Sequence, residues 1–215
     1  MPDAARLIPI PRDNFEESAL PAEKEKEVQA EKPRFFQPDP LLQLKILREL
    51  SALLIERKPD YNLFLSVAME GIFRGIGMDR ILFALLSKNR RSLEVKYAVG
   101  WGPQEEVQGV VFDATLLQQN VFGHILRTRQ PLWVQADRGE KISKLMTREI
   151  TGITGGAPFF LMPIVVSGKA IGLIYADRRT SGRDLDEDSF ASFQHFCQQT
   201  NIGLSFISHQ GISFE

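Results

Sequence analysis

FFLMPIVV (residues 159–166), SG (167–168) and KAIGLIYAD (169–177) form the stretch of the chain that says most about the fold. Both apolar segments have the length of a strand, and the two residues between them match the commonest loop of an antiparallel hairpin. Serine and glycine suit such a loop because a tight turn needs residues that tolerate unusual backbone angles. We therefore predict an antiparallel β-hairpin over residues 159–177.

A second hairpin is predicted upstream of the first. Residues 81–86 are continuously apolar, which is typical of a central strand that is buried on both faces. Residues 88–91 (KNRR) form the turn, and alternation of apolar with polar or small residues then predicts a partner strand. Two short strands are expected at 107–112 and 131–135. The alternating apolar residues of the partner strand are Leu93, Val95, Tyr97 and Val99.

Two helices are predicted before these hairpins. Asp39 and Pro40 supply a capping residue and a first-turn proline for a helix that ends near residue 57. After Pro59, apolar residues at helical spacing predict a second helix over 61–76. The first of these helices has too many apolar residues for one buried stripe, so we expect a second buried face on it.

The region between the two hairpins is predicted to be a helical crossover. Thr115 and Gln118 fit a capping box that opens a helix ending near residue 128. Residues 138–150 also have helical spacing. The glycine-rich residues 151–156 (TGITGG) that follow indicate a mobile loop, and one interpretation of this loop is a lid.

Residues 1–38 differ in composition from the rest of the chain. They hold six of the twelve prolines and the mixed-charge run EKEKE at 23–27, with few large apolar side chains. Such a segment cannot bury enough apolar surface to offset the entropy lost on ordering. We expect a disordered, Pro-rich and charged linker over 1–38, a folded domain over 39–210 and a tail at 211–215. The linker would connect the domain to an upstream domain or partner, with Met1 not necessarily the native start.

Composition argues against several classes of function. The formal net charge is −1, from 26 basic and 27 acidic side chains, so the chain lacks the basic field that attracts nucleic acid. The single cysteine, Cys197, cannot form an internal disulfide, which indicates a reducing compartment. No apolar run reaches the length of a membrane span, and the N-terminus does not resemble a secretion signal. We expect a cytoplasmic protein that binds neither nucleic acid nor membrane.

Three groups of motifs, in this order along the chain, resemble the GAF domain family. They are GMDR at 77–80, GHILRTRQPLWVQAD at 123–137, and MPI at 162–164 followed by GKAIGLIYAD at 168–177. The resemblance spans residues 39 to about 208. It implies an α+β fold with a GAF/PAS-like antiparallel sheet of five to six strands. The N- and C-terminal helices would pack on one face of the sheet and the helical crossover on the other.

A further resemblance concerns the domain's context. PDPLLQLKILREL at 38–50 and GIGMDR at 75–80 are similar to GAF-like domains that follow an HDOD domain in bacterial signalling proteins. This resemblance implies that residues 1–38 are the connector from an upstream HDOD domain.

The GAF resemblance also implies a small-ligand site between the sheet and the crossover region, from Trp101 to Gly156. Such pockets are mostly apolar with a few polar groups, so aromatic side chains would line it and Arg80, His124 or Asp137 would supply a polar end. The alternative is that the aromatic residues are core and that Arg80 is an exposed charge at a strand end. The ligand-binding candidates are Arg80, Phe83, Tyr97, Phe122, His124, Trp133, Asp137, Phe160, Met162 and Tyr175.

Catalysis and metal binding find little support in the sequence. The signature of cyclic-nucleotide-binding relatives is missing, and Cys197 lies outside the crossover region where bilin-binding relatives attach their pigment. A single cysteine cannot run the thiol cycle of the relatives that reduce methionine sulfoxide. The three histidines lack metal-ligand spacing, and there is no nucleophile elbow or P-loop. We expect no enzyme activity and no metal, and the cofactor is undetermined.

A last long helix is predicted from Asp186 or Asp188 to about residue 208, with apolar residues three and four positions apart. This seam and the wide apolar arc of residues 40–57 predict a bundle that pairs with a second copy across a two-fold axis. The alternative is that both helices only cover the sheet. The predicted dimer contacts are Leu44, Leu47, Leu54, Phe193, Leu204 and Ile207.

These observations leave three hypotheses about function. The first is a regulatory domain that senses a small ligand or relays a signal by helix-mediated dimerisation. The second is a degenerate scaffold with a filled core that serves only as a protein interaction platform. The third is an unrecognised enzyme on the same fold.

Overall fold

The computed structural model describes residues 35–55, 60–102, 105, 107–137, 139–156 and 158–209. The predicted linker up to residue 34 and the predicted tail at 211–215 lie outside the described residues. All element bounds below refer to the described part of the chain.

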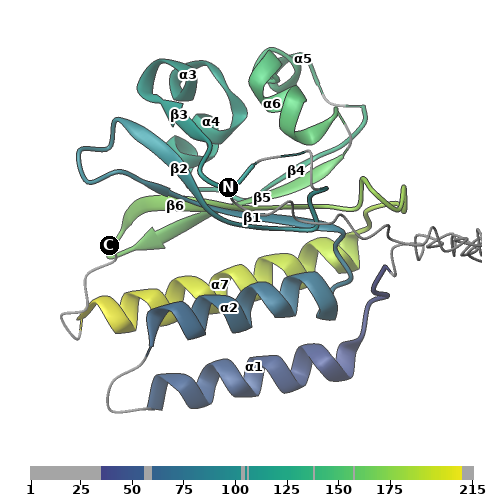
Figure 1. The fold of residues 1–215 in the computed structure, drawn as a ribbon, viewed down its shortest axis with the longest axis vertical. Helices are drawn as coiled ribbons and strands as arrows, with labels where there is room; N and C mark the ends of the chain where they lie inside the picture. The colour runs from purple at the N-terminus through teal and green to yellow at the C-terminus, as the bar shows by residue number, and fades with distance from the viewer. Residues whose placement is uncertain are drawn as a thin grey trace, which may run out of the picture. The chain divides into compact units, whose positions relative to one another are not determined.

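A six-stranded antiparallel sheet forms the centre of the fold, with strand order β3-β2-β1-β6-β5-β4 (Figure 1). The two predicted hairpins supply its four inner strands, and the loop at 167–168 joins the second hairpin as predicted. Because the two hairpins lie side by side in the sheet, their apolar strands are covered by helices on both faces. The strands are β1 Arg80–Leu86, β2 Ser92–Val99, β3 Val111–Asp113, β4 Leu132–Val134, β5 Phe159–Val166 and β6 Lys169–Asp177.

Three helices and a short π-helix cover one face of the sheet. They are α1 Pro40–Ile55, α2 Tyr61–Glu70, η1 Gly71–Gly75 and α7 Glu187–His209. Figure 1 shows α2 and α7 lying next to the sheet, with α1 outside them. The predicted placement of the N- and C-terminal helices on one face is confirmed. Their apolar side chains form a core with the sheet, which we call the helix-side core.

Both long helices begin where the sequence predicted. Asp39 Oδ1 accepts a hydrogen bond from the Leu42 amide at 3.0 Å, and Asp186 Oδ1 accepts one from the Ser189 amide at 2.7 Å. The bond from Ser189, aided by Arg178, lowers the pKa of Asp186 below its ordinary value. Asp186, rather than Asp188, therefore caps α7.

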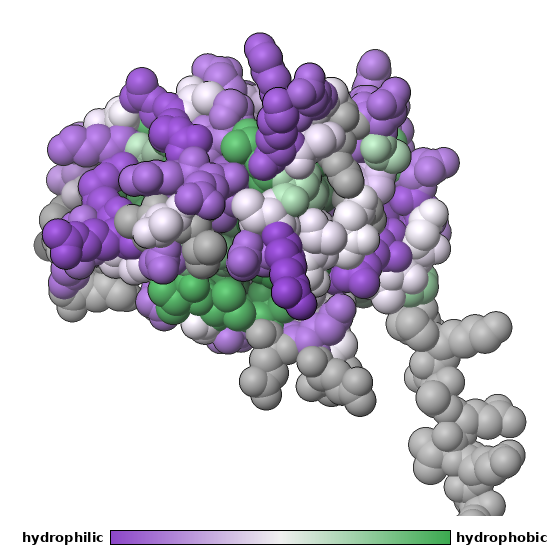
Figure 2. Space-filling view, turned by 90° about the horizontal axis from the view of Figure 1, so that it is seen from above, coloured by the Kyte–Doolittle hydropathy of each residue, from purple (hydrophilic) through white to green (hydrophobic). Residues whose placement is uncertain are grey.

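Four short helices cover the other face of the sheet: α3 Ala114–Gln119, α4 Val121–Thr128, α5 Glu140–Ser143 and α6 Arg148–Thr154. Their apolar residues pack with the opposite side of the sheet in a second core, the crossover-side core. Hydrophilic residues cover most of the surface when the molecule is viewed from this side (Figure 2). The predicted helical crossover is confirmed as a layer.

Two details of the predicted crossover are wrong. The helix expected over 115–128 is broken at Asn120, whose side chain caps α4 by accepting from the Gly123 amide at 3.0 Å. Thr115 is not a cap, because α3 already begins one residue earlier, directly after β3. The α3–α4 corner is tight, since a Cβ at Gly123 would overlap the Leu117 carbonyl.

The predicted loop at 151–156 is also wrong over its first four residues, which belong to α6. Ile150 and Thr154 are buried, and this burial holds the last turn of α6 against the core. The helix ends at Gly155, which has a left-handed φ of 66° and donates its amide to the Thr151 carbonyl. Glycine therefore ends a helix here.

A β-bulge in β2 changes which face its side chains occupy. Phe83 pairs with Tyr97, whereas Ala84 pairs with Val95, so Lys96 is an extra residue in β2. Val95 lies in the crossover-side core, but after the bulge Val99 packs against the helix-side core. Strict alternation would have kept them on one face, and the inserted residue moves the second half of the strand to the other.

A polar network fixes the start of β1. Asp79 accepts from the Ser181 amide at 2.6 Å and from Arg183 Nη2 at 2.9 Å. Arg178 donates to the carbonyls of Ile76 and Gly77 at 3.0 and 3.1 Å. These bonds join the segment before β1 to the segment after β6, and so position the next residue, Arg80.

Candidate functional site

Arg80, the first residue of β1, is buried on the crossover side of the sheet, with 1% of its surface exposed. Its register partner on β6 is Asp177, which is fully buried. Arg80 Nε donates to the two carboxylate oxygens of Asp177 at 3.0 and 3.1 Å, and Nη2 donates to Oδ2 as well. A charge buried this deeply is tolerated only beside a hydrogen-bonded counter-charge.

Two aromatic side chains enclose the Arg80–Asp177 pair. The Tyr175 hydroxyl accepts from Arg80 Nη2 at 3.3 Å and donates to Asp177. The Trp101 ring lies over the guanidinium, with Cζ 4.0 Å from the ring centroid, and its Nε1 donates to the Ile81 carbonyl at 3.3 Å. This stacking is a favourable cation–π contact.

The protonation states of these groups follow from their surroundings. Burial alone would lower the pKa of Arg80, but the hydrogen bond to Asp177 and the nearby negative charges outweigh it and raise that pKa. Burial, together with the charge of Asp177, raises the pKa of Tyr175 well above its ordinary value. Arg80 is therefore a permanent cation and Tyr175 a neutral phenol at physiological pH.

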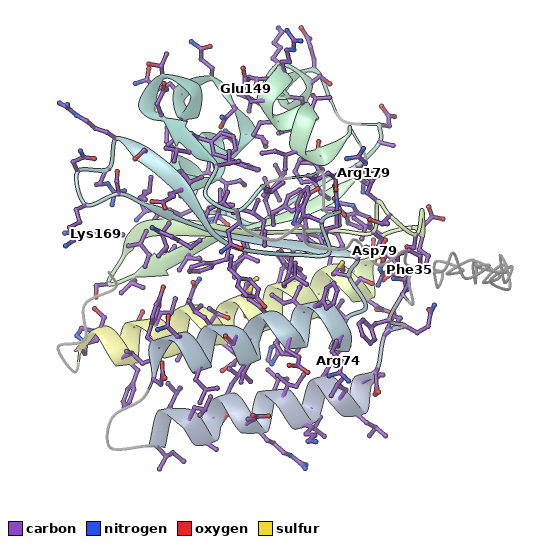
Figure 3. The ribbon with its side chains drawn as sticks, viewed as in Figure 1. Phe35, Arg74, Asp79, Glu149, Lys169 and Arg179 are labelled. Atoms are coloured by element: carbon purple, nitrogen blue, oxygen red, sulfur yellow. The ribbon has the colours of Figure 1, made fainter. Side chains whose placement is uncertain are left out.

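A second arginine, Arg179, and a glutamate, Glu105, lie at the partly exposed edge of this site, which we call the rim. Glu105 Oε1 is 3.8 Å from Arg80 Nη1 and 3.8 Å from Arg179 Nη1. Figure 3 shows Arg179 near α6, at the same end of the sheet as Asp79. We call the residues at this site the Arg80 cluster: Arg80, Trp101, Glu105, Tyr175, Asp177 and Arg179.

The structure does not bring the ten predicted ligand-binding residues together. Arg80, Phe122 and Tyr175 lie on the crossover side, and Arg80 is buried rather than the exposed charge of the alternative reading. Trp133 is half-buried and packs on the helix side, where its ring centroid is 5.5 Å from that of Phe160. Strand alternation explains this split, because residues an odd number of positions apart occupy opposite faces. Phe83, Trp133, Phe160 and Met162 thus contribute to the helix-side core and not to a crossover-side pocket.

Tyr97 and Phe83 line a cavity of about 130 Å³ between β2 and α2, on the helix side of the sheet. Tyr61, whose pKa burial raises to about 12, lies in the same cavity. The bulge in β2 gives Tyr97 this position. His124 is half-buried on α4, and Asp137 is exposed after β4.

Four members of the Arg80 cluster were missed in the sequence: Trp101, Glu105, Asp177 and Arg179. One signal in the sequence could have identified the partner of Arg80: Asp177 is an acid at the end of a strand that is otherwise apolar. An acid at that position pairs with a cation at the start of an antiparallel neighbour. Trp101, Glu105 and Arg179 lie in connections whose path the sequence does not specify.

The predicted dimer contacts are also divided by the structure. Leu44 is exposed on α1, whereas Leu47 and Leu54 are half-buried against the helix-side core. Phe193, Leu204 and Ile207 are fully buried in the core of a single chain, and this contradicts the prediction that they contact a second copy. The seam of α7 packs on the sheet of its own chain, mainly on β5.

Cys197 is buried in α7, and burial raises the pKa of its thiol well above the ordinary value. We expect its reaction with a disulfide reagent at pH 8 to be about a thousandfold slower in the native protein than in denaturant, since reaction requires opening of the core. Timed absorbance with 5,5′-dithiobis(2-nitrobenzoate) measures this directly, because the chain has one cysteine. Complete labelling in native buffer at the rate seen in denaturant would show that α7 is not packed as described.

Across the described ranges, no group of three or more His, Cys, Asp or Glu side chains is arranged to hold a metal ion. Within the same residues, none of the helices combines the length and the apolarity needed to cross a membrane.

Comparison with known proteins gives one family match and many structural matches. The sequence model described as "GAF domain" matches residues 60–204. No curated protein is significantly similar to the chain in sequence.

Three solved structures illustrate the likeness. Residues 122 to 287 of a methyl-accepting chemotaxis protein are 22% identical, cover 80% of this chain and 99% of that one, and give a TM-score of 0.60. The phycocyanobilin-bound GAF domain of a cyanobacterial phytochrome is 14% identical; the match covers 80% of this chain and 98% of that one, with a TM-score of 0.61. The GAF domain of the Acinetobacter phosphoenolpyruvate-protein phosphotransferase is 15% identical; the match covers 79% of this chain and 97% of that one, with a TM-score of 0.55. At these identities the likeness establishes the fold, and the connection to an HDOD domain stays a prediction.

Proposed function

Because the chain belongs to the GAF domain family, we propose that its domain is regulatory and not catalytic. In this proposal it senses a small molecule at the Arg80 cluster and relays the signal by pairing the α1 helices of two copies. The structural relatives from a chemotaxis protein and a phytochrome support a sensory role. The buried Cys197, with its raised pKa, supports the absence of thiol catalysis.

The observation that carries the proposal is a row of exposed positions along α1. Leu41, Leu44, Arg48, Ser51 and Ile55 are all exposed and follow one another at spacings of three and four. Such spacing is that of a coiled-coil seam, and at 3.6 residues per turn it places all five on one side of the helix. We call this row the α1 seam.

The α1 seam is distinct from the face that packs on the rest of the chain. Ile46, Leu50 and Leu53 are the buried residues of α1 and lie on the opposite side of the helix. Leu41 and Ile55, at the two ends of the seam, are 80% and 85% exposed. Large apolar side chains that are this exposed favour burial against another apolar surface. The α1 helix of a second copy offers such a surface, because it carries the same seam.

Arg48, in the middle of the seam, provides a test of this proposal. We expect Arg48→Leu to lower the dimer dissociation constant about tenfold or more, since it replaces a like-charge contact between two copies by apolar packing. Size-exclusion chromatography with light scattering at several protein concentrations measures the change.

Lys45→Leu is the matched control, because it also replaces a basic residue of α1 by leucine, but outside the α1 seam. Lys45 lines the groove between α1 and α2 together with Glu49 and Glu70. If both variants lowered the dimer dissociation constant equally, the association would be nonspecific, and pairing through the α1 seam would be refuted.

A platform without any ligand is the second candidate function. It is favoured by the packing of the crossover-side core, in which Phe122, Phe159 and Tyr175 are completely buried. Native mass spectrometry of the purified chain separates the two candidates. A retained small molecule that Arg179→Gln abolishes supports sensing, whereas a bare chain that still dimerises supports the platform.

A further inference from the structure

Among the described residues, the guanidinium of Arg80 has hydrogen-bond partners on one side only. Its Nε and Nη2 atoms make five hydrogen bonds, to Asp177, Tyr175 and the Thr154 carbonyl. Within the described residues, Nη1 makes none, and its one charged neighbour is Glu105 Oε1 at 3.8 Å. That separation exceeds the 2.7–3.2 Å of a hydrogen bond. A buried arginine thus directs towards Glu105 a pair of N–H donors that make no hydrogen bond within the described part of the chain.

Glu105 interacts with Arg179 in the same incomplete way. Its Oε1 lies 3.8 Å from Arg179 Nη1, and its Oε2 accepts from the Gly102 amide at 3.2 Å. The Glu105 side chain is 43% exposed and can turn into solvent. One carboxylate therefore stands between two arginines without a short bond to either, and an exposed ion pair of this kind is worth little.

The rest of the Arg80 cluster holds the two arginines in place. Trp101 covers Arg80, and the Arg179 guanidinium lies against Gly155, where a Cβ would overlap it. Asp177 neutralises Arg80, so removal of Glu105 from the rim would leave Arg179 as uncompensated charge. An anionic group placed between Arg80 Nη1 and Arg179 Nη1 could form short charge-assisted hydrogen bonds to both.

We propose that Arg80 and Arg179 bind the carboxylate of a small organic acid, which displaces Glu105 from the rim. Glu105 is the built-in competitor, because its own carboxylate occupies the position that the ligand requires. This inference rests on the proposed sensory function and adds to it the chemical class of the ligand, its two binding residues and the group that sets its threshold.

Acetate is the probe, and fluorescence of Trp101 is the readout in a Trp133→Phe background, which leaves one tryptophan. Titration at constant ionic strength should give a saturable change, since Trp101 stacks on Arg80. Glu105→Gln should bind acetate about tenfold more tightly, because a tethered competitor acts at millimolar effective concentration. Arg179→Gln should weaken binding about tenfold or more, through the loss of a charged hydrogen bond.

Two control variants remove the same charges elsewhere. Glu149→Gln eliminates a carboxylate on α6, and Arg129→Gln eliminates an arginine whose Nη1 donates to the Gly168 carbonyl. Neither residue belongs to the Arg80 cluster. Both should leave acetate binding unchanged.

Three results would overturn the inference. Equal tightening by Glu105→Gln and Glu149→Gln would show a general effect of net charge. Binding of inorganic phosphate without binding of acetate would refute the carboxylate assignment. No saturable change with the Glu105→Gln variant would refute an anion site altogether. Sedimentation of the same variants without acetate keeps these outcomes separate from the proposed function, because pairing through the α1 seam then involves no residue of the Arg80 cluster.

Discussion

Asparagine in place of Asp177 should destabilise the protein by about 3–5 kcal/mol, because it leaves Arg80 as a buried charge without a counter-charge. The substitution keeps the size of the side chain, so the loss reflects charge and hydrogen bonding more than packing. Asp177 also accepts from the Arg179 amide at 3.1 Å and from Tyr175, so its removal weakens the whole Arg80 cluster. Urea denaturation followed by fluorescence measures the free energy of unfolding.

A second variant keeps this prediction testable if the first fails to fold. Arg80→Met removes the cation, so adding it to Asp177→Asn should restore a measurable unfolding transition. Where both single variants fold, Asp177→Asn should cost at least about 2 kcal/mol less in the Arg80→Met background than it does alone, as expected for residues in direct contact. If Asp177→Asn alone costs less than about 1 kcal/mol, the value of a neutral hydrogen bond, the pair is not the buried ion pair described.

Aspartate in place of Leu44 should raise the dissociation constant of the dimer about 100-fold, because each copy loses about 1.5 kcal/mol of apolar burial and gains a repelling charge. Leu44 lies in the α1 seam and is 46% exposed in the single chain, so the free energy of unfolding should change little. Sedimentation equilibrium of the variant measures the dissociation constant, and circular dichroism checks the fold.

Leu63→Asp is the control for this prediction. Leu63 is 45% exposed, nearly the same as Leu44, but it lies on α2 outside the α1 seam. It should leave the dissociation constant within about threefold of the parent, the usual scatter of surface changes. Loss of the dimer with Leu63→Asp and its persistence with Leu44→Asp would move the interface from α1 to α2.

The layers of the fold could be predicted from local patterns. The runs at 81–86 and 159–177 have the length, apolarity and turn residues of central strands. Asp39 and Asp186 mark the starts of α1 and α7 because side-chain capping is a local interaction. These features depend on residues a few positions apart, which a sequence displays directly.

The site could be predicted only in part, because it depends on register and on connections. Arg80 and Tyr175 were among the candidates, but the bulge at Lys96 and strand alternation assign Phe83, Tyr97 and Phe160 to the opposite face. Burial of Arg80 follows from a partner that is distant in sequence, Asp177. The same dependence on residues distant in sequence explains the wrong prediction for α7. Its apolar residues do have coiled-coil spacing, but they pack on the sheet of their own chain and not on a second copy.

Sedimentation velocity of the unmodified chain between about 5 and 200 µM tests most directly whether α1 pairs two copies, since weak interfaces dissociate in this range. Pairing through the α1 seam predicts a weight-average sedimentation coefficient that rises with concentration from the monomer value towards that of a dimer. A single monomeric species over the whole range would contradict it.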